Sequence, residues 1–564
     1  MNCPIRTIPG LSTASDTPGH GAARPETTRA GPERQPMVLE NTRVHAAETG
    51  ACAEPMPLGV RRRRLVLLTL CAVAFMITED TAMQTIAVQT LLRQLGHRPD
   101  LTISMWLPTA HVVAYVALLL GGGALADRLG AKRVMVGGYL IYLVGVALHV
   151  CFPSIPIALL VARTTMGVGA AAILPASLAM VVLVYGDGSR RARAVTAWAG
   201  CSTAGVMVAM LVTAVILNQV WWPNVLVAVM IANLIVLVGV LTAVPAVAVD
   251  PASPIDWPAI LAMVGSGGLL ALGLHQAVTV GFTSPLFLAA MVLGGALAVV
   301  AALIRRGGSL PHDWLVSAAP RVRLVMLALG CAVLSMFGMV FLVIQYLQVL
   351  GGEVPVVAGL ALFLPTCLAT AVGAKIGAAF YRGGCAVVAV IIGSTAIMDG
   401  LAIGLTAGEP GDLTPLVAMA TVTSLGCALV LGIALEVLSA ANPTRRTGVR
   451  WAAKLVLVQL CGLWGVAIVN GLVAHGYAAN FVVPAAVRAV GGVDVGHDPV
   501  GDGVRAVSMA DDRLGVPLAI ALRNAFVAGY RGGLLATIGV VAVVMVVMLV
   551  AVALNRKSKT ESLQ

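Results

Sequence analysis

Charged side chains are scarce in this chain. Only 11% of its 564 residues are Asp, Glu, Lys or Arg, whereas 59% are hydrophobic and the mean hydropathy is +0.95. A soluble chain of this length needs about a quarter of its residues charged to cover its surface. The composition therefore excludes a soluble protein and predicts that most of the outer surface faces lipid.

Patterns that hold metals, nucleotides or disulfides are also missing. The ten Cys are scattered singly without metal-ligand spacing, and most lie inside apolar runs, where they act as small packing residues. No G-x-x-x-x-G-K-[ST] phosphate loop is present, which argues against ATP-driven transport. The short, basic connections lack the clustered carboxylates, His or metal ligands that a lipid-linked transferase needs. We therefore expect no cofactor, no metal site and no enzymatic activity.

The first 60 residues differ in composition from the rest. Residues 1–60 are rich in Pro, Thr, Ala, Gly and Arg and show no apolar periodicity, which predicts a disordered cytoplasmic tail. No apolar stretch precedes Arg61–Arg64, so the tail does not resemble a signal peptide. A sensor or scaffold would usually carry an extra soluble domain, and this tail cannot fold alone.

From Leu65 onward, apolar segments alternate with short connections. About 20 helical residues cross a hydrocarbon core of about 30 Å, so each segment is long enough to span a membrane. The sequence predicts an all-α polytopic protein with about fourteen spans. They are expected at 65–88, 105–126, 134–152, 157–184, 194–217, 223–244, 258–280, 286–304, 322–350, 357–380, 386–407, 414–438, 451–474 and 532–554.

The basic residues predict the orientation. The net charge of +11 could suggest a nucleic-acid partner, but Lys and Arg fall in clusters in every second connection, and the alternate connections near 153–156 and 281–285 contain none. Cytoplasmic loops carry this excess of Lys and Arg. We therefore expect a multi-pass protein of the cell membrane with both termini in the cytoplasm, in contact with the lipid bilayer and not with nucleic acid.

The most specific stretch lies between the second and third predicted spans. Residues 123–133 read Gly-Ala-Leu-Ala-Asp-Arg-Leu-Gly-Ala-Lys-Arg. Two antiparallel helices need a tight turn there, which a glycine permits, and an acid at a helix end can hold a basic residue or a helix terminus. The stretch resembles the loop signature of the major facilitator superfamily, which implies a cytoplasmic gate. The matching positions are Gly123, Asp127, Arg128, Gly130, Lys132 and Arg133.

Other segments resemble the fourteen-helix drug:proton antiporters of that superfamily. Trp106-Leu-Pro-Thr-Ala opens the second span, Arg163-Thr-Thr-Met-Gly-Val-Gly lies in the fourth, and Gln345-Tyr-Leu-Gln348 in the ninth. The resemblance implies proton-coupled efflux of small amphipathic or cationic compounds by a monomer, with protons and substrate as partners. It also implies two six-helix bundles around two inserted helices. The expected divisions are 1–60 (tail), 61–244 (first bundle), 245–320 (insert and linkers), 321–554 (second bundle, with an external loop at 475–531) and 555–564 (cytoplasmic tail).

The fifth predicted span departs from that family. Antiporters carry a Gly-Pro pair followed by Gly-Gly there, whereas residues 198–213 contain neither doublet. An importer of the facilitator type, or an exporter of one dedicated metabolite with the same fold, therefore stays open as an alternative.

Ionisable residues inside the spans are the site candidates, because each charge at a helix centre costs at least about 2.5 to 3.5 kcal/mol. Asp80 lies about fifteen residues, or roughly 22 Å, into its helix, and Arg163 about six residues, or roughly 9 Å, from the opposite side, which predicts one level and one cavity. Glu79 is rotated about 100° from Asp80, so the two acids should face different points. A structural ion pair is the alternative for either acid. The remaining candidates for the cavity are Gln84, Gln345, Gln348 and Asp399.

Overall fold

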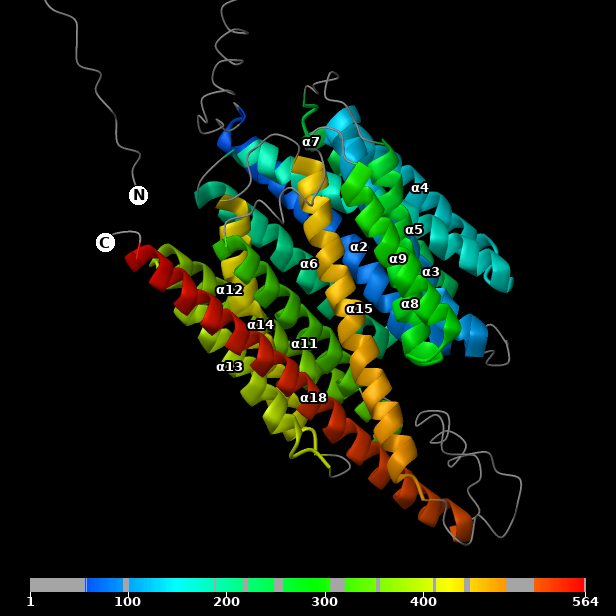
Figure 1. Ribbon diagram of the computed structural model, residues 1–564. Coiled ribbons are helices and arrows are strands. Elements are labelled where there is room, and N and C mark those ends of the chain that lie inside the picture. The colour runs from blue at the N-terminus through cyan, green and yellow to red at the C-terminus, as the bar shows by residue number, and fades with distance from the viewer. Residues whose placement is uncertain are drawn as a thin grey trace, which may run out of the picture. The chain divides into compact units, whose positions relative to one another are not determined.

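The computed structural model describes most of the apolar part of the chain. The described residues are 56, 58–94, 101–186, 189–216, 222–247, 257–304, 320–350, 356–408, 412–440, 447–482 and 512–561. Within them the regular elements are fourteen long helices (Figure 1). The predicted tail before residue 56 and most of the predicted loop at 475–531 lie outside the described residues.

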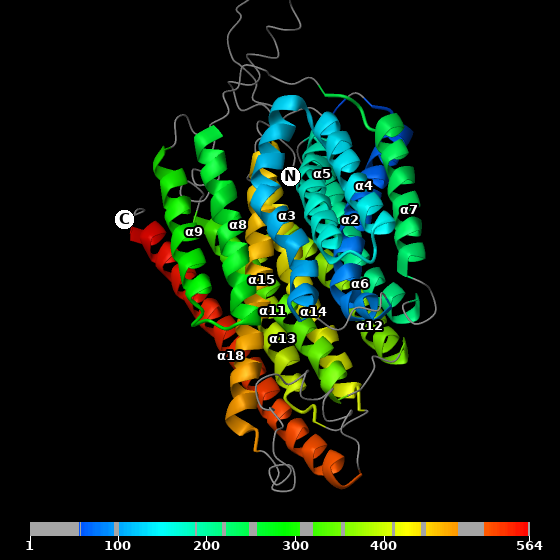
Figure 2. The ribbon, with the colours of Figure 1, turned by 90° about the vertical axis from the view of Figure 1, so that its right-hand side faces the viewer.

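Six helices form the first bundle, two follow, and six form the second bundle (Figures 1 and 2). The first bundle comprises α2 (Val60–Gln94), α3 (Leu101–Leu129), α4 (Ala131–Cys151), α5 (Pro156–Tyr185), α6 (Ser189–Ile216) and α7 (Trp222–Ala243). The inserted pair is α8 (Trp257–Thr279) and α9 (Pro285–Ile304). The second bundle comprises α11 (Pro320–Leu350), α12 (Val356–Arg382), α13 (Ala386–Gly404), α14 (Thr414–Ala440), α15 (Thr447–Asn480) and α18 (Asp512–Glu561).

The two bundles repeat one packing pattern. In the first, α2 packs against α6 and α7, while α5 packs against α3 and α4. In the second, α11 packs against α15 and α18, while α14 packs against α12 and α13. Each helix of the first bundle thus has a counterpart in the second, in the same chain order.

Glycines allow equivalent helices to approach closely in both bundles. A Cβ atom on Gly122 of α3 would overlap the carbonyl oxygen of Ala171 on α5. A Cβ atom on Gly377 of α12 would overlap the carbonyl oxygen of Leu429 on α14 in the same way. Membrane helices use small residues at such contacts because lipid supplies no hydrophobic force between helices.

The inserted helices contact both bundles. α8 packs against its partner α9, against α3 of the first bundle and against α15 of the second, as Figure 2 shows. Leu274 and Ala277 of α8, Phe287 of α9 and Ala467 of α15 form one small buried cluster. The insert therefore lies along the side of the molecule where α3 and α15 are neighbours.

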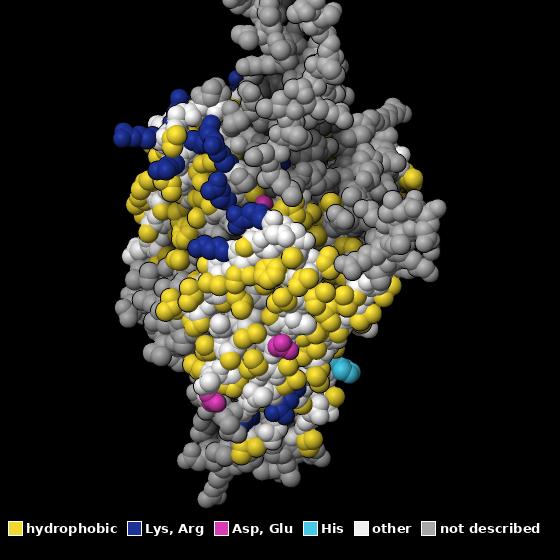
Figure 3. Space-filling view, turned by 90° about the vertical axis from the view of Figure 1, so that its left-hand side faces the viewer, with side chains coloured by type: hydrophobic (Ala, Val, Ile, Leu, Met, Phe, Trp, Pro, Cys, Tyr) yellow, Lys and Arg dark blue, Asp and Glu magenta, His cyan; other side chains and the backbone are white. Residues whose placement is uncertain are grey.

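The outer surface has the character expected of a membrane protein. Eleven helices of the described chain are long and apolar enough to cross a bilayer, and α2, α6 and α9 complete the set of fourteen. Large apolar side chains are exposed on their outer faces, for example Ile235 at 67% and Leu303 at 77%. Figure 3 shows hydrophobic side chains over much of one face, with most of its Lys and Arg gathered toward one end. The predicted all-α fold of two bundles and two inserted helices is confirmed.

The last helix differs from its prediction. α18 begins at Asp512, whereas the sequence pattern placed the start of the span at 532 and assigned 512–531 to the external loop. The misleading residues are Arg513, Arg523 and Arg531, which break the apolar run. Arg523 donates a hydrogen bond to the carbonyl oxygen of Gly408 beyond α13, so this charge is used in helix packing and not left in a loop.

Candidate functional site

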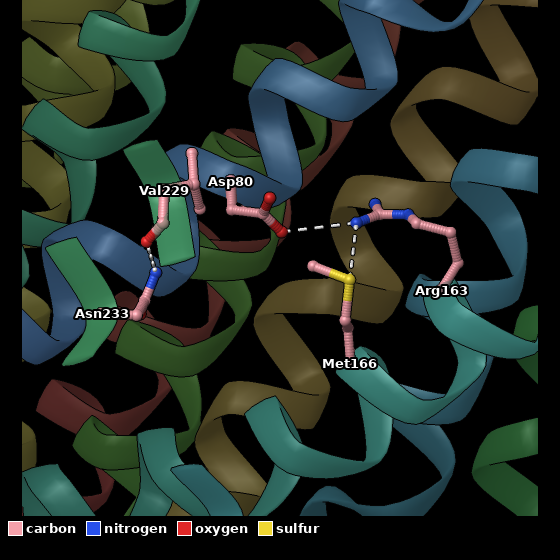
Figure 4. A network of polar contacts seen from close by, with 5 residues as sticks. All are labelled: Asp80, Arg163, Met166, Val229 and Asn233. Atoms are coloured by element: carbon pink, nitrogen blue, oxygen red, sulfur yellow. Dashed lines mark hydrogen bonds and ion pairs between the residues drawn. The ribbon is translucent and has the colours of Figure 1, made fainter. Parts of the chain in front are cut away.

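The predicted acid and base of the first bundle meet in its interior. Nη1 of Arg163 on α5 lies 3.3 Å from Oδ2 of Asp80 on α2, and neither side chain is exposed. Figure 4 shows the two side chains extending toward each other from their helices. Two residues separated by 83 positions thus lie at one level, as their distances along the helices predicted.

Three polar side chains of α3 and α4 lie near this ion pair. Tyr142 of α4 lies next to Asp80, and His149 of the same helix lies near Arg163. His111 of α3 also lies near Arg163. All three are buried. On α5 itself, one turn after Arg163, the sulfur of Met166 lies 4.0 Å from the same Nη1 atom (Figure 4).

The ion pair leaves several polar atoms unsatisfied. A guanidinium group has five N–H donors. Nε and Nη2 of Arg163 have no hydrogen-bond partner among the described residues, and neither ring nitrogen of His149 has one. A buried ion pair that serves stability alone should have its remaining donors satisfied. The cluster therefore has donors and acceptors to spare for a proton, a water molecule or a substrate group.

Glu79 lies apart from this cluster, although it precedes Asp80 in sequence. Its side chain is buried, and it lines a groove formed by α2, α6 and α7. The rotation of about 100° between successive residues explains why the two acids point to different places. The prediction that they face different points matches this geometry.

In the second bundle, Gln345 joins α11 to α15. Its Nε2 donates a hydrogen bond of 3.1 Å to Oδ1 of Asn470, while its Oε1 has no partner in the described part of the chain. The next residue, Tyr346, packs near Phe526 and Tyr530 of α18. This places an amide pair beside an aromatic cluster in the second bundle.

The other cavity candidates are not brought to the ion pair. Asp399 is exposed on α13, which belongs to the second bundle, so the structure separates it from Asp80. The side chains of Gln84 and Gln348 lie outside the described residues. Sequence reasoning missed Tyr142, His149 and Asn470, and the available signal was a polar residue inside an otherwise apolar span.

The loop signature forms the turn between α3 and α4. Gly130 has a φ of 94°, which a glycine adopts without strain. Nζ of Lys132 donates a hydrogen bond of 2.8 Å to the carbonyl oxygen of Leu241, in the last turn of α7. Asp127 is half-buried, Gly123 is buried, and Arg128 and Arg133 are exposed. Gly384, with a φ of 77°, lies in the corresponding turn between α12 and α13 of the second bundle.

The two matching helix bundles form an internal repeat, and the first contains a buried ion pair with unsatisfied hydrogen-bond donors. This architecture is typical of secondary membrane transporters. Comparison of the sequence with known families names the particular kind. The model of the Major Facilitator Superfamily matches residues 68–465, and the chain belongs to this superfamily.

Curated relatives are resistance and efflux proteins of bacteria. The puromycin resistance protein pur8 of Streptomyces alboniger is 29% identical over 75% of this chain and 83% of its own length. The methylenomycin A resistance protein of Bacillus subtilis is 26% identical over 73% of this chain and 87% of its own. The multidrug efflux pump LfrA of Mycolicibacterium smegmatis is 24% identical over 77% and 86%. The chain is thus a multi-pass secondary transporter whose relatives include two antibiotic resistance proteins and a multidrug efflux pump.

Solved structures agree on the fold. The inward-facing, unoccupied structure of a bacterial homologue of the human lysosomal transporter Spinster has a TM-score of 0.56 and 14% identity, covering 88% of this chain and 98% of that one. The human organic anion transporter MFSD10 (TETRAN) has a TM-score of 0.52 and 14% identity, covering 86% and 99%.

Proposed function

We propose that this transporter uses the proton gradient to export small amphipathic or cationic compounds, and that the Asp80–Arg163 pair couples the two movements. The observation that carries the proposal is the buried ion pair at 3.3 Å whose guanidinium keeps unsatisfied nitrogens. The resistance and efflux proteins among the relatives support the direction and the substrate class.

The coupling follows from the energetics of a buried charge. While Asp80 is ionised, its charge compensates that of Arg163. A proton on Asp80 would remove that compensation, and an uncompensated buried charge costs about 3 to 5 kcal/mol. Such a cost is large enough to favour a different arrangement of α2 against α5, in which water or a cationic substrate reaches the pair. Proton and substrate would then compete for one carboxylate.

Alternating access requires the bundles to rock against each other. Trp451, near the start of α15, is buried in the same core as residues of α2, α4 and α5. The second bundle therefore contacts the first through this tryptophan. We propose that this contact breaks when the transporter changes state.

The proposed orientation rests on the basic clusters. Three connections on the same side of the predicted topology carry basic residues: Arg128 and Arg133 at the α3–α4 turn, Arg190 and Arg193 at the start of α6, and Arg382 at the end of α12. By the positive-inside rule this is the cytoplasmic side, with both termini there. The residue divisions of the two bundles and the monomeric state are part of the same proposal.

One departure favours the alternative of a facilitator or dedicated exporter. α6 lacks the glycine doublets of antiporters, and a Cβ atom on its Gly205 would instead overlap the carbonyl oxygen of Phe75 on α2. Everted membrane vesicles loaded with a panel of dyes and toxic cations decide between the two. Proton-coupled efflux predicts accumulation that a protonophore abolishes, whereas a facilitator would move one compound equally well with and without the protonophore.

A further inference from the structure

A groove on the side of the first bundle is separate from the ion pair. It has a volume of about 380 Å³ and lies between α2, α6 and α7. Its floor is one face of α2, formed by Phe75, Met76, Glu79 and Met83, and Ala228 belongs to its α7 wall. The volume falls within the range of about 300 to 1,000 Å³ that small-molecule sites occupy.

Glu79 is the charged group of this groove. Its side chain is only 5% exposed, and its Oε2 atom has no hydrogen-bond partner within the described structure. Burying a carboxylate without a partner is costly. Arg163 bonds to Asp80, and no Lys, Arg or His is among the described residues that line the groove, so a cation that enters the groove can pair with Glu79.

The packing of the neighbouring helices builds the groove. The hydroxyl of Thr78 on α2 lies 2.8 Å from the carbonyl oxygen of Ser202 on α6 and 2.8 Å from that of Ala74 in its own helix, so α6 lies close against α2 here. α7 packs against α2 as well. In the second bundle the counterparts of α6 and α7, α15 and α18, pack directly on each other, with Gly476 against Gly529. Between α15 and α18 this close contact takes the position that the groove has between α6 and α7.

The lining selects the chemistry of the occupant. A carboxylate selects a cation, while a floor of Phe and Met side chains favours aromatic and apolar groups. The carboxylate of Glu79 and the amide of Asn224 are too few oxygen groups for a hard metal ion, which takes about six to eight oxygen ligands. The outer face of α7 next to the groove carries exposed apolar residues such as Ile235, so a ligand dissolved in the bilayer can reach it from the side.

We propose that this groove binds a lipophilic organic cation from the bilayer, with Glu79 as its counter-ion. The site is distinct from the Asp80–Arg163 pair and does not depend on the role proposed for that pair. It gives the transporter a lateral place where amphipathic cations gather beside the helix that carries Asp80.

Equilibrium binding of radiolabelled tetraphenylphosphonium to the full chain in lipid nanodiscs tests the proposal. Glu79→Gln removes the charge and should weaken one class of binding sites at least tenfold. Ala228→Trp fills the groove from α7 while Glu79 itself is kept, and it should have the same effect. Ile235→Trp, on the exposed outer face of α7, is the matched control and should bind as the unaltered protein does. Neutral triphenylphosphine oxide should bind at least tenfold more weakly than the cation.

Unchanged tetraphenylphosphonium binding in Glu79→Gln and Ala228→Trp would overturn the proposal, and so would equal binding of the cation and its neutral analogue. Ala228→Trp keeps the test valid if Glu79→Gln fails to fold. Asp80→Asn should retain the groove component, and its loss there alone would assign the site to the ion pair instead. Gradient-driven transport by Asp80→Asn tests the coupling role separately, so failure of one proposal does not imply failure of the other.

Discussion

Lys132, in the turn between α3 and α4, donates a hydrogen bond of 2.8 Å to the carbonyl oxygen of Leu241 in the last turn of α7. The last carbonyl groups of a helix lack partners within it, and a cation near them also interacts favourably with the helix dipole. The loop signature thus ties the α3–α4 turn to a third helix of the same bundle.

Replacing Lys132 with Gln should therefore slow transport. The shorter, uncharged side chain loses the charged hydrogen bond to α7, a contribution of about 1.5 to 3 kcal/mol when fully formed and less at an exposed position. We expect the maximal rate to fall several-fold while substrate affinity changes less than twofold, measured by dye efflux in proteoliposomes. Arg133→Gln is the matched control, because Arg133 is exposed in the same turn. An equal loss in both variants would show that the charge of the loop matters and not the bond to Leu241.

Reporter fusions should place the connections on the predicted sides. A fluorescent protein fused after Gly186, between α5 and α6, should fold and fluoresce in the cytoplasm, and one fused after Glu561 should do the same. Alkaline phosphatase fused after Gly281, between α8 and α9, should be active outside. The expectation follows from the basic residues at the first connection and their absence from 281–285. If alkaline phosphatase were fused after Gly186 instead and proved active, the orientation of the whole chain would be contradicted.

The glycine contacts predict a matched pair of destabilised variants. Gly122→Ala adds a Cβ atom against the α5 backbone, and Gly377→Ala does so against α14. Overpacking of this kind typically costs about 1 to 3 kcal/mol. Both variants should therefore melt at lower temperature in detergent. Gly137→Ala on α4 is the control, because nothing lies within 4 Å of its added Cβ atom. It should melt at or above the original temperature, since Ala favours a helix over Gly by about 1 kcal/mol. If the melting temperature fell in all three variants, the cause would be a loss of helix flexibility and not overpacking.

The sequence predicted the fold well because length and hydropathy specify membrane helices directly. It also predicted the level of Asp80 and Arg163, since both positions follow from the rise per residue along antiparallel helices. Contacts that depend on helix rotation could not be predicted. The Gln345–Asn470 bond joins residues 125 positions apart, and the place of Tyr142 beside Asp80 requires the register of α4 against α2. The early start of α18 was missed because its arginines interrupt the apolar run. The hydrogen bond from Arg523 to the carbonyl oxygen of Gly408 can be seen only in the folded chain.

Variants of the ion pair should separate its structural role from its role in coupling. Asp80→Asn leaves Arg163 buried without its counter-charge, so it should lower stability by about 3 to 5 kcal/mol and abolish gradient-driven transport. Arg163→Lys should also be poorly tolerated, because an ammonium group lacks the planar geometry of the guanidinium.

The double variant Asp80→Asn/Arg163→Gln decides between the two roles. It removes both charges, and replacing a buried ion pair with neutral groups is often nearly neutral for stability. We therefore expect its melting temperature to return close to that of the original protein. If the pair couples proton and substrate movement, the double variant should still bind ethidium but should not accumulate it against a gradient in proteoliposomes. A variant that recovers both stability and gradient-driven accumulation would show that the pair only holds α2 against α5, and the proton site would then have to be sought at another buried acid, with Glu79 the nearest in the chain.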